Sequence, residues 1–180
     1  MTIQTLDVEN SDYEIFKYSQ FVMTKARQFV THYYHNFEAN KIFKNVYLGS
    51  IDSVYDIAAL RKLKIKNIVS VIADFSPPYP DDFNYLVVNA LDTTNTNLTK
   101  IFDKVNDFID DSLDDNKAVL IHCYAGRSRS VAVLIAYMIR TYGMKYEDAL
   151  KSIKNVREIA EPNESFKEQL IIYYNSKYIV

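Results

Sequence analysis

The sequence predicts a single α/β domain in which a central, mostly parallel or mixed sheet of four to five strands is flanked by helices, with an extra helix at the N-terminus. Three observations support this fold. Short apolar runs rich in β-branched residues alternate with longer segments of helical periodicity. Several of the short runs are apolar at nearly every position, as is typical of strands covered on both faces. A chain of 180 residues, 48% of them hydrophobic, is long enough to bury one core.

Residues 1–40 are predicted to form a helical extension that precedes the main domain over residues 41–180. Ser11 and Glu14 have the spacing of a capping box, and apolar side chains then recur at helical intervals over residues 15–37. This helix can pack on its own chain or exchange with a second copy to form a homodimer, and the sequence leaves both arrangements open. The helix lacks the basic face of a membrane-binding segment.

The main domain is predicted to begin with two strands that are separated by a helix. Residues 42–50, with the sequence IFKNVYLGS, form the first strand, and residues 67–73, NIVSVIA, form the second. The helix covers residues 53–63, in which Ser53 and Asp56 fit the positions of caps. The cluster of prolines after the second strand interrupts regular structure.

The second half of the domain is predicted to continue this alternation of strands and helices. In order, we expect a buried strand over residues 85–91, a helix over 98–113, a central strand over 117–122, a buried helix over 129–142, a helix over 145–157 and a last helix from Asn163 onward. Gly143 marks the end of the buried helix, and Pro162 marks the boundary before the last one.

Charge and hydropathy exclude several classes of partner. The chain has 21 basic and 23 acidic residues, so it exerts no long-range attraction on nucleic acid or on an anionic membrane. No stretch approaches the roughly 20 apolar residues that cross a bilayer, and the N-terminus lacks the pattern of a leader peptide. We expect neither nucleic acid nor a membrane as a partner.

Cys123 is the only cysteine of the chain. A single cysteine excludes an intramolecular disulfide and a zinc site built from several cysteines. We therefore expect a cytoplasmic protein in a reducing environment, with no metal or other cofactor.

Polar residues follow two of the predicted strands directly. Asp92 comes after the strand over residues 85–91, and a loop that starts at Cys123 comes after the strand over residues 117–122. Ligands of open α/β sheets bind at the carboxyl ends of the strands. We therefore expect Asp92 and this loop to share one site.

The loop over residues 122–130 reads HCYAGRSRS and leads into the buried helix. A loop of this kind presents backbone N–H groups and the positive end of a helix dipole to one point, which suits a phosphate. Gly126 permits a turn that a side chain would obstruct, and Arg129 can donate two parallel hydrogen bonds to phosphate oxygens. Because such surroundings favour a thiolate, we expect Cys123 to be an ionised nucleophile at neutral pH.

The pattern His-Cys-x-x-Gly-x-x-Arg-Ser resembles the signature loop of the cysteine-based protein tyrosine phosphatases, in its dual-specificity form. The resemblance extends over residues 42–174 and includes NVYLGS, Asp92 and the stretch REIAEPNESF over residues 157–166. It implies a fold of the protein tyrosine phosphatase type and hydrolysis of phosphate monoesters through a cysteinyl-phosphate intermediate. Phosphorylated proteins are the substrates that it implies.

The resemblance also implies a role for each site residue. Cys123 would attack phosphorus, Arg129 would bind the phosphoryl oxygens, and Ser130 would help the thiolate to leave. The general acid of the family lies in a loop upstream of the cysteine at a spacing that Asp92 matches, since 123 − 92 = 31. His122 would orient the loop. The residues expected to bind the substrate phosphate are Tyr124, Ala125, Gly126, Arg127, Ser128 and Arg129, with Asn163 in support.

The general acid has a clear chemical purpose. The leaving oxygen of a serine or threonine ester is far more basic than the phenolate of tyrosine, so its departure depends more on a proton donor. The turn-forming residues around Asp92 leave open that it only begins a turn. Asp81 and Asp82 are the weaker candidates for the acid.

Departures from the family pattern define the alternatives. The chain has no tryptophan, so it lacks the tryptophan-bearing acid loop of the tyrosine-specific enzymes, and a shallow pocket that accepts all three phosphorylated residues is expected. Arg127 resembles the extra basic residue of relatives that act on phosphoinositides or other phospholipids, and another relative class acts on RNA 5′-triphosphates. A module that binds phosphoproteins without turnover is the non-enzymatic alternative. The added N-terminal helix is similar to that of poxviral members, which dimerise through it.

Overall fold

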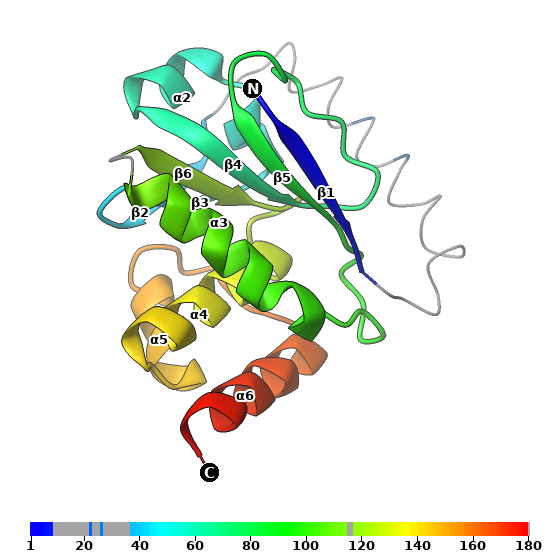
Figure 1. The fold of residues 1–180 in the computed structure, drawn as a ribbon, viewed down its shortest axis with the longest axis vertical. Coiled ribbons are helices and arrows are strands. Elements are labelled where there is room, and N and C mark those ends of the chain that lie inside the picture. Colours follow the sequence, from blue (N-terminus) through cyan, green and yellow to red (C-terminus); the bar gives the residue numbers. More distant parts are fainter. Residues whose placement is uncertain (9–21, 23–25, 27–36, 115–116, 180) are drawn as a thin grey trace.

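Six strands of the computed structural model form one mixed sheet (Figure 1). The structure describes residues 1–8, 22, 26, 37–114 and 117–179. The order of the strands across the sheet is β1-β5-β4-β6-β3-β2, and every neighbouring pair is parallel except β2 with β3. The strands are β1 (Ile3–Asp7), β2 (Ala39–Phe43), β3 (Val46–Gly49), β4 (Ile65–Val71), β5 (Asn84–Asn89) and β6 (Ala118–His122). The predicted α/β class is confirmed, whereas the sheet has more strands than the predicted four to five.

The sequence does not predict strand β1, which lies at one edge of the sheet. It pairs in parallel with β5, and Ile3 lies opposite Tyr85 in the register. Four of its five residues are exposed, so it has no continuous apolar pattern of the kind that marks the central strands. The first residues of the chain therefore belong to the same sheet as the segments that carry the site.

The predicted strand over residues 42–50 is in fact two strands that form a hairpin. Strands β2 and β3 are antiparallel, and the turn between them contains Asn45 with a φ of 64°. Asparagine adopts this left-handed conformation more readily than most residues because its short side chain can hydrogen-bond locally. The apolar residues on both sides of the turn conceal it in the sequence.

The helices agree with the predictions for the second half of the chain and differ in the first half. The helical elements are η1 (Ile51–Val54), α2 (Ile57–Lys62), η2 (Thr99–Ile101), α3 (Phe102–Asp114), α4 (Arg129–Tyr142), α5 (Tyr146–Lys154) and α6 (Glu164–Tyr178). Helix α4 has the predicted bounds, and Gly143 ends it in a left-handed conformation. In the predicted helix over residues 53–63, only Asp56 is an N-cap: its side chain accepts a hydrogen bond from the Ala59 N–H. The Ser53 hydroxyl instead donates to the backbone oxygen of Glu38.

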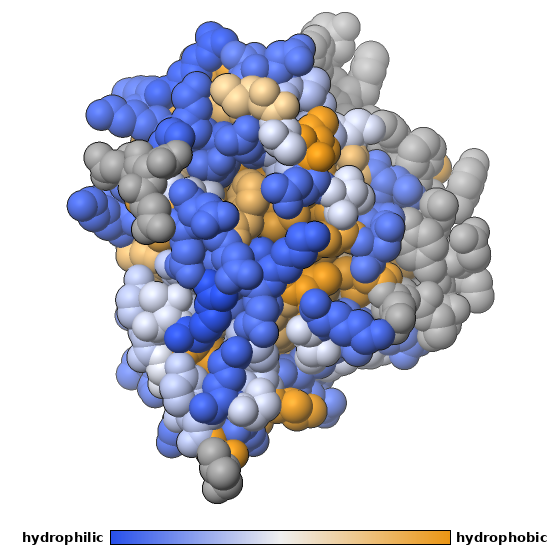
Figure 2. Space-filling view, in the orientation of Figure 1, coloured by the Kyte–Doolittle hydropathy of each residue, from blue (hydrophilic) through white to orange (hydrophobic). Residues whose placement is uncertain are grey.

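Helix α4 occupies the centre of the domain, which explains why it is apolar on more than one face. In Figure 1, helices α3 to α6 gather on one side of the sheet and α2 lies on the other. The first eleven residues of α4 are buried between the sheet and its neighbouring helices. The face of the molecule in Figure 2 is mostly hydrophilic, with hydrophobic side chains visible in its centre and beside the residues drawn in grey. Among the described helices, none combines the length and apolar character that a membrane span requires.

The predicted N-terminal helix falls almost entirely outside the described residues. Within it the structure describes Val22 and Ala26, which are helical, and Phe37, which packs against the core. The helix and its role in a homodimer stay predictions.

Candidate active site

The two polar segments that the sequence assigns to one site do meet at one edge of the sheet. The loop between β6 and α4 lies beside Asp92, three residues beyond the end of β5. One carboxylate oxygen of Asp92 accepts hydrogen bonds from Ser128 Oγ at 2.8 Å and from Asn163 Nδ2 at 3.0 Å. The other oxygen accepts one from Arg129 Nε at 3.3 Å. Asp92 therefore bridges the loop and the start of α6.

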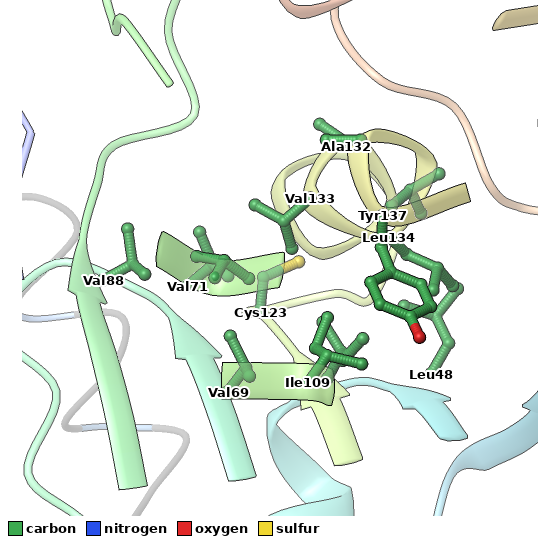
Figure 3. Packing of buried hydrophobic residues seen from close by; sticks show 14 of the residues in the cluster. Leu48, Val69, Val71, Val88, Ile109, Cys123, Ala132, Val133, Leu134 and Tyr137 are labelled. Carbon is green, nitrogen blue, oxygen red and sulfur yellow. The ribbon is translucent and has the colours of Figure 1, made fainter. Parts of the chain in front are cut away.

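Cys123 lies at the base of the loop and is 1% exposed. Its sulfur is directed towards α4, as Figure 3 shows, and accepts a hydrogen bond from Ser130 Oγ at 3.1 Å. A hydroxyl that donates to sulfur stabilises negative charge on it. The first turn of the helix thus supplies a donor at the atom for which the sequence predicts a thiolate.

The carbonyl oxygens of the loop are bound by groups that lie outside it. Those of residues 124 to 128 accept hydrogen bonds, in order, from the Ile51 N–H, the Arg157 Nη2, the Arg157 Nε, the Glu161 N–H and the Ala132 N–H. Because a peptide unit is planar, the N–H groups of residues 125 to 128 lie on the side opposite the bound carbonyls that precede them. A loop that contains a left-handed residue and enters a helix N-terminus gathers such groups into an anion-binding hollow.

Gly126 is the left-handed residue of this loop, with a φ of 64°. A Cβ atom at this position would lie 2.4 Å from the backbone oxygen of Gly49 and 2.6 Å from Arg157 Nη2. Both the dihedral angle and the available space therefore require glycine, as the sequence predicts for the turn.

His122 is fully buried beneath the loop. Its Nε2 lies 2.7 Å from Ser70 Oγ, and its Nδ1 lies 3.4 Å from the backbone oxygen of Cys123. Because a carbonyl only accepts, these contacts assign the proton to Nδ1 and make Ser70 the donor to Nε2. Burial lowers the pKa of His122 to about 4, and the charge of Arg129 acts in the same direction. His122 is therefore a neutral element that links β6 to β4.

The two arginines of the loop have opposite surroundings. The side chain of Arg129 is 4% exposed, and its Nη1 donates to the backbone oxygen of Ala90 at 3.1 Å. The side chain of Arg127 is 59% exposed and forms an ion pair with Glu161. The hydrogen bond from Arg127 holds the pKa of Glu161 below its usual value. The charge of Arg127 is thus largely matched by a neighbour on its own chain.

An open hollow of about 480 Å³ lies next to the loop. Its lining residues are Asp92, Arg127, Ser128, Glu161, Pro162, Asn163 and Glu164. Of the two weaker acid candidates, Asp82 forms an ion pair with Arg61 of α2, and Asp81 is exposed at the proline cluster.

Three residues that support the loop have no role predicted from the sequence, although Arg157 begins the stretch over residues 157–166 that resembles the family. Ser70 lies in the middle of an apolar strand, Arg157 follows α5, and Glu38 precedes the first residues of the hairpin. Their contacts join segments far apart in the chain, up to 119 residues in the case of Arg157 and Glu38. A single sequence contains no signal for such pairs. The position of Arg157 beside a predicted helix end is the one feature that could have drawn attention to it.

Comparisons with known proteins identify the family to which the chain is similar. Residues 46–176 match the family model described as dual specificity phosphatase, catalytic domain. The chain is 38% identical to dual specificity protein phosphatase 1 of Arabidopsis thaliana over 129 residues, which are 72% of this chain and 65% of that protein. It is 36% identical to human dual specificity protein phosphatase 22 over 131 residues, 73% of this chain and 71% of that one.

A solved structure shares the fold over most of the chain. The human tyrosine phosphatase-like serine/threonine/tyrosine-interacting protein superposes with a TM-score of 0.76 and 32% identity, covering 81% of this chain and all of the other. The chain covers slightly under two thirds of the plant relative's length and smaller shares of several others. The match over residues 46–176 includes the site loop, and the chain belongs to the dual specificity phosphatase family.

Proposed function

We propose that the protein hydrolyses phosphate monoesters on phosphotyrosine and on phosphoserine or phosphothreonine of proteins, through a cysteinyl-phosphate intermediate. One observation carries the proposal. The buried Cys123 sulfur lies at the base of a loop in which the carbonyls of residues 124 to 128 are bound by groups outside it, and Asp92 contacts that same loop. A nucleophile, an anion-binding hollow and a carboxyl group therefore share one site.

In the first step, Cys123 Sγ attacks phosphorus and the bond to the leaving oxygen breaks. The loop N–H groups and Arg129 hold the phosphoryl oxygens, and protonated Asp92 gives its proton to the leaving oxygen. A phosphate oxygen would compete with Asp92 for the Nε–H of Arg129, which now donates to the carboxylate at 3.3 Å. Substrate binding would thereby release Asp92 to act at the leaving group.

In the second step, water attacks phosphorus of the cysteinyl-phosphate and the S–P bond breaks. Asp92, now a carboxylate, takes the proton from water. Ser130 Oγ already donates to Cys123 Sγ at 3.1 Å, so it is placed to stabilise the thiolate as it leaves. His122 holds the strand end beneath this pair, and Asn163 holds the Asp92 carboxylate.

The surroundings of Arg127 support protein substrates over phosphoinositides. A loop arginine favours a substrate with several phosphates when its charge is free to meet the second one. Here Glu161 binds the Arg127 side chain directly. With the cation matched by an anion, a second phosphate on the substrate gains little, and a singly phosphorylated residue is the favoured ligand.

The binding-module alternative rests on a relative and not on the site itself. The printed name of the human structural relative describes a phosphatase-like interacting protein. In this chain Cys123, Asp92, Arg129 and Ser130 are all present, Arg129 contacts Asp92 and Ser130 contacts Cys123, which supports turnover. Cytoplasmic location and a homodimer through the N-terminal segment stay predictions. Sedimentation equilibrium of the full chain tests the homodimer.

Phosphate release from the full chain without added metal tests the proposed function. The substrates are a phosphotyrosine peptide, a phosphothreonine peptide and a phosphoinositide, and the variants are Cys123→Ser and Glu161→Gln. We expect release from both peptides by wild type, none by Cys123→Ser, and a gain of about threefold to tenfold for the phosphoinositide in Glu161→Gln, which frees Arg127. Preference of wild type for the lipid would reverse the substrate assignment, and peptide binding without release would establish a binding module.

A further inference from the structure

Arg157 is a buried cation that contacts two consecutive carbonyls of the site loop. Its side chain is 4% exposed. Its Nε donates to the backbone oxygen of Gly126 at 2.7 Å, and its Nη2 donates to that of Ala125 at 3.1 Å. The guanidinium is planar and its donors are fixed relative to one another, so the two carbonyls are held at a set distance and direction.

The other side of the same guanidinium is held by the segment that leads into β2. Arg157 Nη2 donates to Glu38 Oε1 at 2.9 Å, and Nη1 donates to Asn40 Oδ1 at 2.8 Å. A buried cation without a counterion is strongly unfavourable. Glu38 is the carboxylate in contact with Arg157, so the charge that keeps Arg157 in place comes from outside the region that matches the family model.

Glu38 is itself fixed at both its side chain and its backbone. Its Oε2 accepts a hydrogen bond from Ser50 Oγ at 3.1 Å. Its backbone oxygen accepts from the Ser50 N–H at 3.2 Å and from Ser53 Oγ at 2.6 Å. Both serines are buried. A Cβ atom at Gly49 would lie 2.7 Å from the Glu38 oxygen, so the glycine before Ser50 permits this close approach.

A continuous set of contacts therefore runs from the buried serines through Glu38 and Arg157 to the loop. The peptide unit is planar, so holding a carbonyl outward also holds the N–H of the next residue on the opposite side. Fixing the carbonyls of residues 125 and 126 thus fixes two of the amides that face the proposed phosphate.

We propose that Glu38 is a positioning residue for this loop: through Arg157 it sets the direction of the amides that bind the phosphate. The inference rests on the proposed function. Glu38 touches no reacting atom, and its side chain is 48% exposed, so it lacks the burial of a catalytic group. This role extends phosphate recognition to a residue that precedes the region matched by the family model.

The test compares Glu38→Ala and Glu38→Gln with Asp107→Ala in the full chain. Asp107 is a matched control, because its exposed carboxylate also pairs with a partly buried arginine, Arg140, far from the loop. Three quantities are measured for each: kcat and KM on the phosphotyrosine peptide, the Kd for inorganic phosphate by calorimetry, and the Tm.

We expect Glu38→Ala to lower kcat/KM by about 10- to 100-fold and to weaken phosphate binding by about tenfold, since small misplacement of binding groups has effects of this size. Glu38→Gln keeps an oxygen that can accept from Arg157 but loses the charge, so its losses should be intermediate. Asp107→Ala should leave kcat/KM and Kd unchanged, with a shift in Tm similar to that of Glu38→Gln.

Activity and phosphate affinity of both Glu38 variants within about twofold of the Asp107→Ala values would overturn the proposal. The proposal would also be overturned if the losses of activity and phosphate affinity were fully explained by a larger unfolded fraction of the variants, as shown by a lower Tm. The calorimetric Kd needs no turnover. If wild type binds phosphate but hydrolyses nothing, the proposed function fails while the role of Glu38 is still decided.

Discussion

The two ends of helix α4 carry the same residue in the same conformation for different reasons. Gly126, in the loop before the helix, and Gly143, directly after it, both have a φ of 64°. A Cβ atom at Gly143 would meet nothing closer than Tyr178, at 3.9 Å, whereas one at Gly126 would lie 2.4 Å from the backbone of Gly49. Gly143 follows a local rule of helix termination. Gly126 also satisfies a constraint from chain segments that are distant in sequence.

Each end of α4 also has an arginine that pairs with an aspartate. At the N-terminal end, Arg129 contacts Asp92 with side-chain exposures of 4% and 25%. At the C-terminal end, Arg140 contacts Asp107 with exposures of 22% and 69%. An exposed pair of this kind contributes little to stability, whereas the buried one shapes a site. The comparison implies that equivalent changes at the two ends should have unequal consequences.

The largest expected difference between the two ends is in catalysis. Asp92→Asn removes the proposed proton donor and should lower kcat/KM by about 10²- to 10⁴-fold, with the larger loss on phosphothreonine peptide because its leaving group is more basic. Asp107→Asn should leave kcat/KM unchanged. Steady-state kinetics of both variants on phosphotyrosine and phosphothreonine peptides measure this. Equal effects at the two ends, or equal losses on the two peptides, would contradict the role of Asp92.

The second prediction compares the two glycines. Gly126→Ala imposes a strained dihedral and a steric clash, so it should reduce the free energy of unfolding by about 2–5 kcal/mol and nearly abolish phosphate release. Gly143→Ala imposes the dihedral strain alone, about 1–2 kcal/mol, with normal activity in the folded fraction. Urea denaturation and phosphate release are measured side by side. Comparable destabilisation by both substitutions would mean that the space around Gly126 is not limiting.

The third prediction concerns how the stability of the protein depends on pH through His122, which is buried beneath the loop at the N-terminal end of α4. His122 has a pKa of about 4 in the folded protein, against about 6.5 when unfolded. Between these pH values the unfolded state binds a proton that the folded state does not, so stability falls as pH decreases from 6.5 to 4. The full effect is about 3 kcal/mol, complete by about pH 4.

Replacement of His122 isolates this contribution from the carboxylates that titrate in the same range. Urea denaturation of wild type and of His122→Asn at pH 7 and pH 4.5 should show a smaller loss on acidification in the variant. An identical pH dependence in both proteins would show that His122 is not the group responsible.

The parts of the molecule that could be predicted from the sequence are those that depend on neighbouring residues. Helix α4 is recognisable from its apolar residues and from Gly143, and the loop over residues 122–130 is recognisable from its order of residues alone. The position of Asp92 beside that loop follows from the rule for strand ends. Asn163 is recognisable as a helix start, and its amide reaches Asp92.

The parts that could not be predicted depend on which distant segments meet. The sequence alone suggests that Arg127 is a loop cation available to the substrate, and only the fold brings Glu161 into contact with it. The turn at Asn45 is concealed because apolar residues continue on both sides of it. Glu38 and Arg157 have no pattern that links them, since their contact follows from the hairpin and the end of α5 reaching the same side of the loop.

Strand β1, at the start of the sequence, pairs with a strand from the middle of it. Each pair that it forms with β5 closes 82 residues of chain, as between Ile3 and Tyr85, and its own residues are mostly exposed. Closing so long a loop has an entropic cost that few buried contacts offset here. We therefore expect β1 to dock after the centre of the sheet during folding and to detach first in the native state. Its amide hydrogens should exchange with solvent through local opening, whereas those of β4 and β6 should exchange only on global unfolding.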